Sequence, residues 1–280
     1  MHANRRVTIV AAFVLFVSVS LAAQWPAFPT PNVPRTADGK PDLGAKAPRT
    51  ADGKPDFTGM WQNPGWRNLG TGVSGTGGAP GTPAVLPRGP GLFFDLASAV
   101  PGGLPLTPFG ASLKKTRMAN NNKDNPDAHC LPIGNMQLHT HPQPRKIVQT
   151  PSVMLVLYEG NAGIRQILID GRPLPSRDVQ PWWFGYTTAA WDGDALVAKT
   201  TGFRDDGWLD VNGSPLTDAA TVTERFTRPD FGHLVIDVTI DDPKAYTKPW
   251  SVTVNQDLML DTDLIEFVCN ENEKSSAHFR

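Results

Sequence analysis

The stretch that decides the fold is TVTERFTRPDFGHLVIDVTI, residues 221–240. Two runs of β-forming residues, 220–228 and 233–241, are separated by a short segment that contains Pro229 and Gly232, residue types that are common in turns. The second run roughly alternates apolar with polar side chains, as expected of a strand with one buried and one solvated face. The stretch therefore predicts two consecutive strands that are joined by a short turn.

The same pattern extends over most of the chain from Lys146 onward. Short β-type runs follow one another, and their connections carry Gly or Pro at turn positions. The further runs that we expect to be strands are 147–150, 153–159, 165–170, 184–191, 195–203, 250–259 and 264–272. Eight or nine antiparallel strands with mostly short links favour a mainly β fold, an up-and-down barrel, because closure removes vulnerable edges and eight strands can enclose one small ligand. A β-sandwich is the alternative.

The first residues have the pattern of a secretory signal peptide. Two arginines, residues 5–6, precede a nearly unbroken apolar run, 7–21, and small residues follow at 22–23. The alternative is a retained anchor, but the apolar run is shorter than the ~20 residues that span a bilayer as a helix. We therefore expect cleavage after residue 23, export to the periplasm or the extracellular space, and no membrane-spanning segment in the mature chain.

The nine residues PRTADGKPD occur twice, at 34–42 and 48–56. Both copies lie in a proline-rich region, 24–56, which has no hydrophobic periodicity and predicts an extended tail. Only the second copy continues into FTGMW, residues 57–61, whose Phe and Trp predict an anchor on the barrel. Two polar segments cannot bury a core as a structural repeat. The first copy is therefore expected to be a tolerated duplication, and the second marks where the fold begins.

The rest of the chain, 57–280, is expected to form a single β-barrel domain. Its segment 62–128 is dominated by Gly, Pro, Ser and Asn, so much of it should be a long surface loop. One short helix is predicted inside this segment, with Thr107 as N-cap and Pro108 at the first helical position, followed by ASLKKTRMA.

Charge and cysteine content narrow the possible functions. The chain has 26 basic and 27 acidic residues and a net charge of −1, so no bulk field favours nucleic acid or anionic lipid, and nucleic-acid binding is not expected. Cys130 and Cys269 are its 2 cysteines. In an exported protein an even pair predicts a disulfide, and a reactive thiol is the alternative.

A pair of histidines is the most suggestive metal-type feature. His139 and His141 would point to the same side of an extended segment, where both can bind one divalent cation with a third ligand such as Glu159 or Glu224. The alternative is ordinary loop histidines, because two prolines follow closely. The sequence contains no phosphate loop, dinucleotide fingerprint or nucleophile elbow. A divalent metal is thus the one cofactor that the sequence leaves open.

Acidic and basic residues suggest a second kind of chemistry. Glu224 lies in the middle of a predicted strand, with apolar residues two positions away on either side, so it shares their face. If that face lines an apolar cavity, the pKa of Glu224 is raised and the carboxyl becomes a candidate general acid or base, with Arg225 stabilising developing negative charge. The alternative is a buried Glu–Arg pair that organises the barrel end. Asp170 is a further catalytic candidate, although it also fits a turn.

Aromatic side chains gather near strand ends between residues 182 and 250. Rings at the mouth of a cavity can stack on a flat or sugar-like ligand, whereas ordinary core packing is the alternative for each of them. The candidate ligand-binding residues are Trp182, Trp183, Tyr186, Trp191, Trp208, Tyr246, Trp250 and Arg172.

Several of these motifs are similar to those of known families. The Gly-x-Trp within 57–61 resembles the start of the first lipocalin strand, and residues 191–203 and 223–240 resemble paired strands of lipocalin-like and fatty-acid-binding barrels. From 49 to 272 the chain also resembles a family of exported bacterial proteins of unknown function, which carry R-T-x-D-G-K-P-D followed by G-x-W, and later C-x-P-x-G, I-V-Q-T-P, T-E-R and D-D-P-K-x-Y-T-K-P-W. A His-Ser pair that often precedes T-E-R in that family is replaced here by Pro-Leu-Thr at 215–217. This resemblance implies export and transfers no activity.

These observations lead to one leading function hypothesis and two alternatives, of which the less specific is an envelope-associated structural or partner-binding protein that uses the proline-rich region, 24–56. The leading hypothesis is an exported, lipocalin-like protein that binds a small, largely apolar or aromatic molecule in a barrel cavity. The more specific alternative is a cofactor-free or metal-assisted hydrolase, lyase or isomerase on the same scaffold, which uses Glu224 and Arg225 or the pair of His139 and His141.

Overall fold

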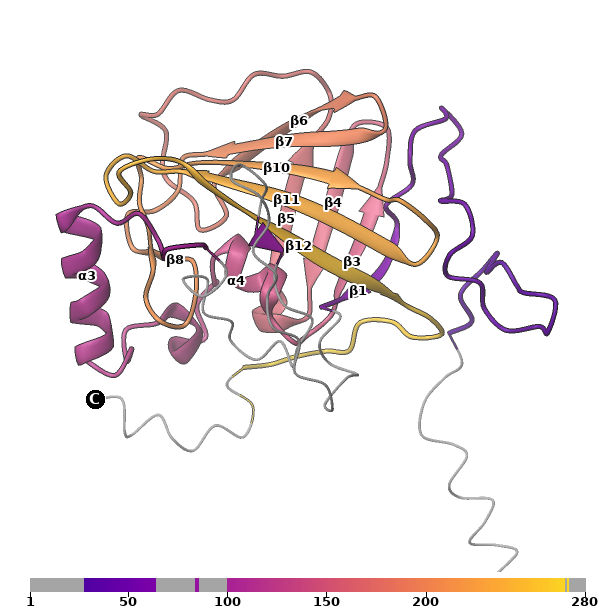
Figure 1. Cartoon of the computed structure of the whole chain (residues 1–280), viewed down its shortest axis with the longest axis horizontal. Helices are drawn as coiled ribbons and strands as arrows, with labels where there is room; N and C mark the ends of the chain where they lie inside the picture. Colours follow the sequence, from indigo (N-terminus) through magenta and orange to yellow (C-terminus); the bar gives the residue numbers. More distant parts are fainter. Residues whose placement is uncertain (1–27, 64–83, 86–99, 270, 272–280) are drawn as a thin grey trace, which may run out of the picture.

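The computed structural model describes residues 28–63, 84–85, 100–269 and 271, and these form a closed β-barrel with segments packed around it (Figure 1). The predicted signal peptide, 1–23, and most of the predicted loop between 62 and 128 lie outside the described residues.

Nine strands form the barrel in an order that follows the sequence. Going around the wall, they are β1 (Gly59–Gln62), β3 (Arg145–Gln149), β4 (Val153–Tyr158), β5 (Ile164–Leu168), β6 (Tyr186–Asp192), β7 (Ala195–Thr201), β10 (Thr221–Thr227), β11 (His233–Asp241) and β12 (Trp250–Met259). Pairing of β1 with β12 closes the ring, which confirms the predicted barrel and excludes the sandwich. Neighbouring strands are antiparallel, except that β5 and β6 are parallel.

The parallel pair follows from the long connection between β5 and β6. Residues 169–185 carry no barrel strand, and they return the chain to the end of the barrel at which β5 began. The two strands pair through only two residue pairs, Ile167 with Thr187 and Leu168 with Thr188. This junction, the β5–β6 seam, therefore has fewer paired residues than the antiparallel pairs on either side of it.

One predicted strand, 264–272, is wrong for the part that the structure describes, because residues 264–269 form no strand. The physical reason is closure: β12 already pairs with β11 on one side and with β1 on the other, so the ring offers no edge for a further strand. The predicted first strand within 57–61 is confirmed by β1.

Short elements complete the fold. The helix α3 (Pro108–Ala119) forms at the predicted place, where the Thr107 hydroxyl accepts a hydrogen bond from the N–H of Gly110 at 3.1 Å. The other short elements are α4 (Asn135–Thr140), the 3₁₀ turns η2 (Pro126–His129) and η3 (Gly160–Ala162), and the strands β2 (Ala84–Val85), β8 (Gly207–Trp208) and β9 (Pro215–Leu216). In the described part of the chain, no helix has the length and apolar character needed to cross a bilayer.

The interior of the barrel contains a helix as well as side chains from the wall. Alternate residues of β10 and β11 are buried, as the period of a strand requires, and their apolar side chains form much of the core. All six residues of α4 are buried, and Figure 1 shows this helix against the inner side of the strands. The predicted disulfide between Cys130 and Cys269 is present, with a Cα–Cα distance of 5.6 Å, and it ties the chain before α4 to the segment after β12.

The proline-rich segment differs from the predicted extended tail. Each copy of PRTADGKPD folds into a compact loop, closed by an antiparallel bridge between its arginine and its second proline. Between the two loops, the carbonyls of Leu43 and Ala45 accept hydrogen bonds from the N–H groups of Gly232 and Phe231, both at 2.8 Å. The segment is thus a strap that is fastened to the β10–β11 turn.

Candidate functional site

Glu224 lies inside the barrel, on the same face of β10 as Val222 and Phe226, as the alternation predicts. Its surroundings are charged rather than apolar. The side chain is 1% exposed, its Oε1 lies 2.7 Å from Nε2 of His139, and both of its oxygens accept hydrogen bonds from the guanidinium of Arg165. The carboxylate therefore has two partners: His139, which the sequence suggested only as a fellow metal ligand, and Arg165, which the sequence did not suggest.

These partners reverse the predicted pKa shift of Glu224. Burial alone raises the pKa, but the charge of Arg165 and the hydrogen bonds from His139 and Arg165 outweigh it and hold the pKa well below its ordinary value. Glu224 thus stays ionised and cannot serve as the general acid that we expected. The alternative, a buried Glu–Arg pair that organises the barrel, fits the geometry, with Arg165 rather than Arg225 as the partner.

Arg225 and Asp170 take no part in this network. As the next residue along β10, Arg225 points to the outer face of the wall, where its Nη1 lies 2.7 Å from Oδ2 of Asp192. Asp170 is at the surface and forms an ion pair with Arg172 at 2.5 Å, which holds a turn. The hydrogen bonds from Arg172 lower the pKa of Asp170. The structure therefore does not bring the three candidate catalytic residues together.

Arg165 is the central residue that the sequence reasoning missed. It lies on β5, 1% exposed, and besides Glu224 its Nη2 donates to Thr200 of β7 at 3.1 Å and reaches Thr187 of β6 at 3.4 Å. The available signal was the alternation in the run IRQIL, which puts Arg165 on the same face as the buried Ile167.

His139 and His141 do not form the predicted pair of metal ligands. The segment is helical rather than extended: His139 belongs to α4, and His141 follows the last residue of the helix. Nε2 of His139 faces Glu224, whereas Nε2 of His141 lies 3.9 Å from Oδ2 of Asp127. No group of three or more His, Cys, Asp and Glu side chains that can hold a metal ion occurs within the described ranges.

The C-terminal end of α4 is held from two sides of the barrel. Nη1 of Arg145, on β3, donates to the carbonyl of His139 at 2.9 Å, and Nε2 of Gln256, on β12, donates to the same carbonyl at 3.0 Å. Carbonyls at a helix C-terminus carry partial negative charge, so a cation is favoured there. Burial lowers the pKa of Arg145 to about 10. One polar network thus connects α4 to strands on several sides of the barrel.

This network occupies the space in which a ligand was expected. Beside Glu224 and His139 a void of about 10 Å³ is left, which is roughly the size of one water molecule. The predicted ligand cavity is therefore not found at this position, because α4 and the buried arginines fill it.

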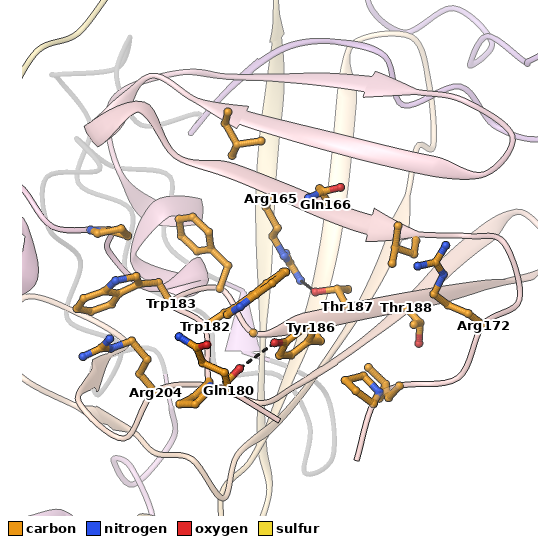
Figure 2. A pocket seen from close by; sticks show the side chains of 18 of the residues that line it. Arg165, Gln166, Arg172, Gln180, Trp182, Trp183, Tyr186, Thr187, Thr188 and Arg204 are labelled. Atoms are coloured by element: carbon orange, nitrogen blue, oxygen red, sulfur yellow. Dashed lines mark hydrogen bonds between the residues drawn. The ribbon is translucent and has the colours of Figure 1, made fainter. Parts of the chain in front are cut away.

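A ligand-sized pocket lies instead at the seam between β5 and β6, with a volume of about 770 Å³ (Figure 2). Outward-facing residues of the two strands and the connection between them form its walls. Arg165 and Thr187, which are members of the buried network, also line the pocket, so the network reaches the bottom of the pocket. The residues are Pro132, Ile164, Arg165, Gln166, Leu168, Arg172, Pro173, Leu174, Pro175, Gln180, Pro181, Trp182, Trp183, Phe184, Gly185, Tyr186, Thr187, Thr188 and Arg204.

Four of the eight predicted ligand-binding residues line this pocket. Trp182 stacks on Tyr186 with ring centroids 4.2 Å apart and an interplanar angle of 24°, and the hydroxyl of Tyr186 donates to the carbonyl of Gln180 at 2.8 Å. Trp183 lies under the guanidinium of Arg204, which is 4.5 Å from the ring centroid. In Figure 2, Trp182 lies next to Tyr186 near the centre of the view and Trp183 lies next to Arg204 at the left; Arg172, at the right, is the fourth residue.

The other four predicted aromatic residues pack elsewhere. Trp191 stacks on Phe57 at 5.8 Å, and Trp208 packs against the guanidinium of Arg117 at 4.5 Å. Tyr246 and Trp250 make an edge contact at 5.4 Å within the core. Core packing, the alternative that we weighed for each aromatic residue, describes these four.

Comparison with known proteins adds no further assignment. No known protein family, characterised protein or solved structure matches this chain significantly. The two resemblances that the motifs carry are therefore hypotheses, and the function has to be inferred from the geometry.

The buried network predicts a dependence of stability on pH. Burial lowers the pKa of His139 more than its contact with Glu224 raises it, so the folded protein resists protonation of this ring. The unfolded chain binds that proton with the ordinary pKa of about 6.5, so the free energy of unfolding should decrease as the pH falls from about 7 to about 5, by at most about 1.4 kcal/mol per pH unit. Urea denaturation at a series of pH values measures this slope.

The slope can be assigned with one variant. His139→Gln keeps a donor for Glu224 and should have a shallower slope than the wild type. Equal slopes for His139→Gln and the wild type would contradict the prediction.

Proposed function

We propose that the protein is an exported binding protein for a small, flat, largely apolar or aromatic molecule, and that this molecule binds in the pocket at the β5–β6 seam. The stacked pair of Trp182 and Tyr186 is the observation that carries the proposal. The volume of about 770 Å³ falls within the range of roughly 300–1,000 Å³ that is typical of small-molecule sites.

The exposure of Trp182 supports a role in binding. This side chain is 49% exposed although tryptophan is among the residues that gain most from burial. One face of its ring is covered by Tyr186, and the hydrogen bond from Tyr186 to Gln180 holds the supporting ring in place. The other side of Trp182 is then a preformed surface on which a planar ligand can stack.

The composition of the walls indicates how a ligand is oriented. Prolines and Leu174 supply apolar surface, while Gln166, Thr188 and Arg172 supply a small number of polar groups. Such a mixture is typical of sites that bury an apolar body and fix it with a few hydrogen bonds. A largely aromatic molecule with one or two polar substituents therefore fits best.

The side chains that line the pocket favour binding over catalysis, because none of those that the structure describes is Asp, Glu or His, the usual general acids and bases. Glu224, the candidate general acid or base, is enclosed and paired with Arg165 below the floor. The disulfide between Cys130 and Cys269 supports the part of the proposal that concerns export, since such bonds persist in oxidising compartments.

Fluorescence titration tests the proposal. Intrinsic tryptophan fluorescence of the full mature chain should be quenched in a saturable way by at least one member of a panel of indoles, phenols, flavonoids and aromatic carboxylic acids. Trp182→Ala should weaken binding of that compound by roughly ten- to a hundredfold, because a central aromatic anchor typically contributes a large share of the affinity. Calorimetry gives the dissociation constants independently of the fluorophore.

A matched substitution separates binding from folding. Trp191→Phe changes a tryptophan that packs on Phe57, away from the pocket, and should leave the affinity unchanged. The proposal is overturned if no compound of the panel saturates the protein, or if Trp182→Ala binds as tightly as the wild type.

A further inference from the structure

The two copies of PRTADGKPD, loop 1 (34–42) and loop 2 (48–56), adopt the same folded structure. In each loop the arginine Nη1 donates to the carbonyl of the glycine four residues later, at 2.7 Å in both cases. The threonine N–H donates to the lysine carbonyl at 2.9 Å in both. Gly39 and Gly53 have φ values of +80° and +79°, a region that favours glycine. The sequence thus encodes one rigid loop twice.

Loop 2 binds the turn between β6 and β7. Nη1 and Nη2 of Arg49 form a bidentate pair with the carboxylate of Asp194, at 3.0 and 2.5 Å. Nζ of Lys54 lies 5.4 Å from the ring centroid of Trp191. Trp191 and Asp194 are the first and last residues of WDGD, 191–194. Loop 2 therefore recognises a hairpin turn through an aromatic ring and, three positions later, an aspartate.

The geometry of loop 2 depends on the fold of the loop itself. Because the bond to Gly53 already fixes the guanidinium of Arg49, little side-chain freedom is lost when its remaining donors meet a carboxylate. The planar fork of arginine also matches the two oxygens of a carboxylate better than lysine does. The loop is thus a preorganised receptor for a carboxylate.

Loop 1 carries the equivalent arginine and lysine, but in the described part of the chain no hairpin turn is bound to them. Arg35 is exposed, is fixed by the equivalent bond to Gly39, and has no carboxylate partner among the described residues. Lys40, the counterpart of Lys54, pairs with Asp38 of its own loop at 2.7 Å and with no other carboxylate that the structure describes, and both side chains are exposed. In Figure 1 the earliest, darkest indigo part of the strap lies away from the barrel wall.

The geometry points to loop 1 as a docking site for a partner protein, which it binds through an acidic hairpin turn of the WDGD type. The partner's aspartate forms the bidentate pair with Arg35, and its aromatic ring lies under Lys40. A second copy of this chain is a poor occupant, since its own WDGD turn is bound by its own loop 2. The partner is therefore a different protein that carries an exposed turn of this chemistry.

A cyclic peptide provides a direct test. The probe is a disulfide-closed hairpin that contains AAWDGDALV, the sequence of residues 189–197, and it is titrated into the full mature chain with backbone amide resonances as the readout. Saturable shifts are expected at the amides of loop 1. Arg35→Gln in the protein, or Asp194→Asn in the peptide, should each weaken binding by roughly ten- to a hundredfold, because each removes a bidentate charge-assisted interaction.

The duplicated loop supplies its own control. Arg49→Gln makes the identical change in loop 2 and should leave the loop 1 shifts and their affinity as in the wild type. Arg35 is exposed, so Arg35→Gln should keep the wild-type melting temperature. The inference is overturned if the peptide produces no saturable shifts in loop 1, or if Arg35→Gln binds it as tightly as the wild type.

Discussion

Replacing Glu224 by glutamine should lower the free energy of unfolding by about 3–5 kcal/mol, because removing one partner of a buried ion pair leaves the other charge uncompensated. Glutamine has nearly the same shape and can still accept a hydrogen bond from His139. It cannot balance the guanidinium of Arg165, which is 1% exposed and has no other carboxylate among its described hydrogen-bond partners. The expected loss therefore comes from charge rather than from packing.

Urea denaturation at neutral pH measures this loss, and the next residue provides the control. Arg225→Gln removes an exposed pair with Asp192 and should change stability by less than about 1 kcal/mol. Adding Arg165→Met to Glu224→Gln should restore much of the stability, since an apolar replacement of a buried pair is often neutral. A loss below about 1 kcal/mol for Glu224→Gln alone would contradict the prediction.

Acid should weaken the same interaction. The folded pKa of Glu224 lies well below its ordinary value, so the unfolded state takes up the proton first. The stabilisation is then complete above about pH 4.3, the ordinary pKa of glutamate, and is lost as the pH falls below that value toward the folded pKa. Glu224→Gln should lack this acid-sensitive contribution.

The sequence placed Glu224 correctly but not its chemistry. Alternation along one strand is a local property, so the inward direction of the side chain followed from its neighbours at 222 and 226. The sign of the pKa shift depends on Arg165, which is 59 positions away and becomes a partner only when the barrel closes. The alternation within one strand predicts whether a side chain points into or out of the barrel. It does not predict which side chains from other strands lie opposite it in the interior.

The sequence predicted a cavity inside the barrel rather than this pocket, but it named some of the side chains that line the pocket, and for a similar reason. Trp182, Trp183 and Tyr186 lie close together in sequence, so one connection carries all three to the same place. Trp208 and Trp250 belong to the same aromatic-rich part of the sequence, but they are buried in the core. Burial depends on tertiary contacts, which the composition does not show. The site itself exists because β5 and β6 pair in parallel, whereas counting strands led us to expect only antiparallel neighbours.

The strap shows a further limit of sequence reasoning. We expected the first copy of the repeat to lead to an unanchored segment, yet Leu43 and Ala45 are fixed through their carbonyl oxygens. Backbone pairing requires no particular side chain, so nothing in the sequence marks it. By contrast, the aromatic anchor at 57–61 was predicted, because two large apolar side chains in a polar region indicate burial.

Trp61→Ala should destabilise the protein by about 3–5 kcal/mol, the loss typical of truncating a fully buried tryptophan. Trp61 is 0% exposed, and its Nε1 donates to the carbonyl of Phe57 at 2.9 Å. The guanidinium of Arg228 lies 4.9 Å from the centroid of the ring and also donates to the carbonyls of Asp56 and Phe231. Truncation therefore leaves a cavity in the core and removes one wall of the site that holds Arg228.

This second consequence distinguishes Trp61 from an ordinary core residue. Arg228 connects the end of loop 2 to the β10–β11 turn, so its loss of support should release the strap before the barrel unfolds. Limited proteolysis under native conditions should cut Trp61→Ala within residues 28–56 faster than the wild type, and denaturation should give the loss in stability. Trp182→Ala, which truncates a half-exposed ring, should change stability by less than about 1 kcal/mol and leave the strap protected. Equal cleavage rates for Trp61→Ala and the wild type would show that the strap is held without Arg228.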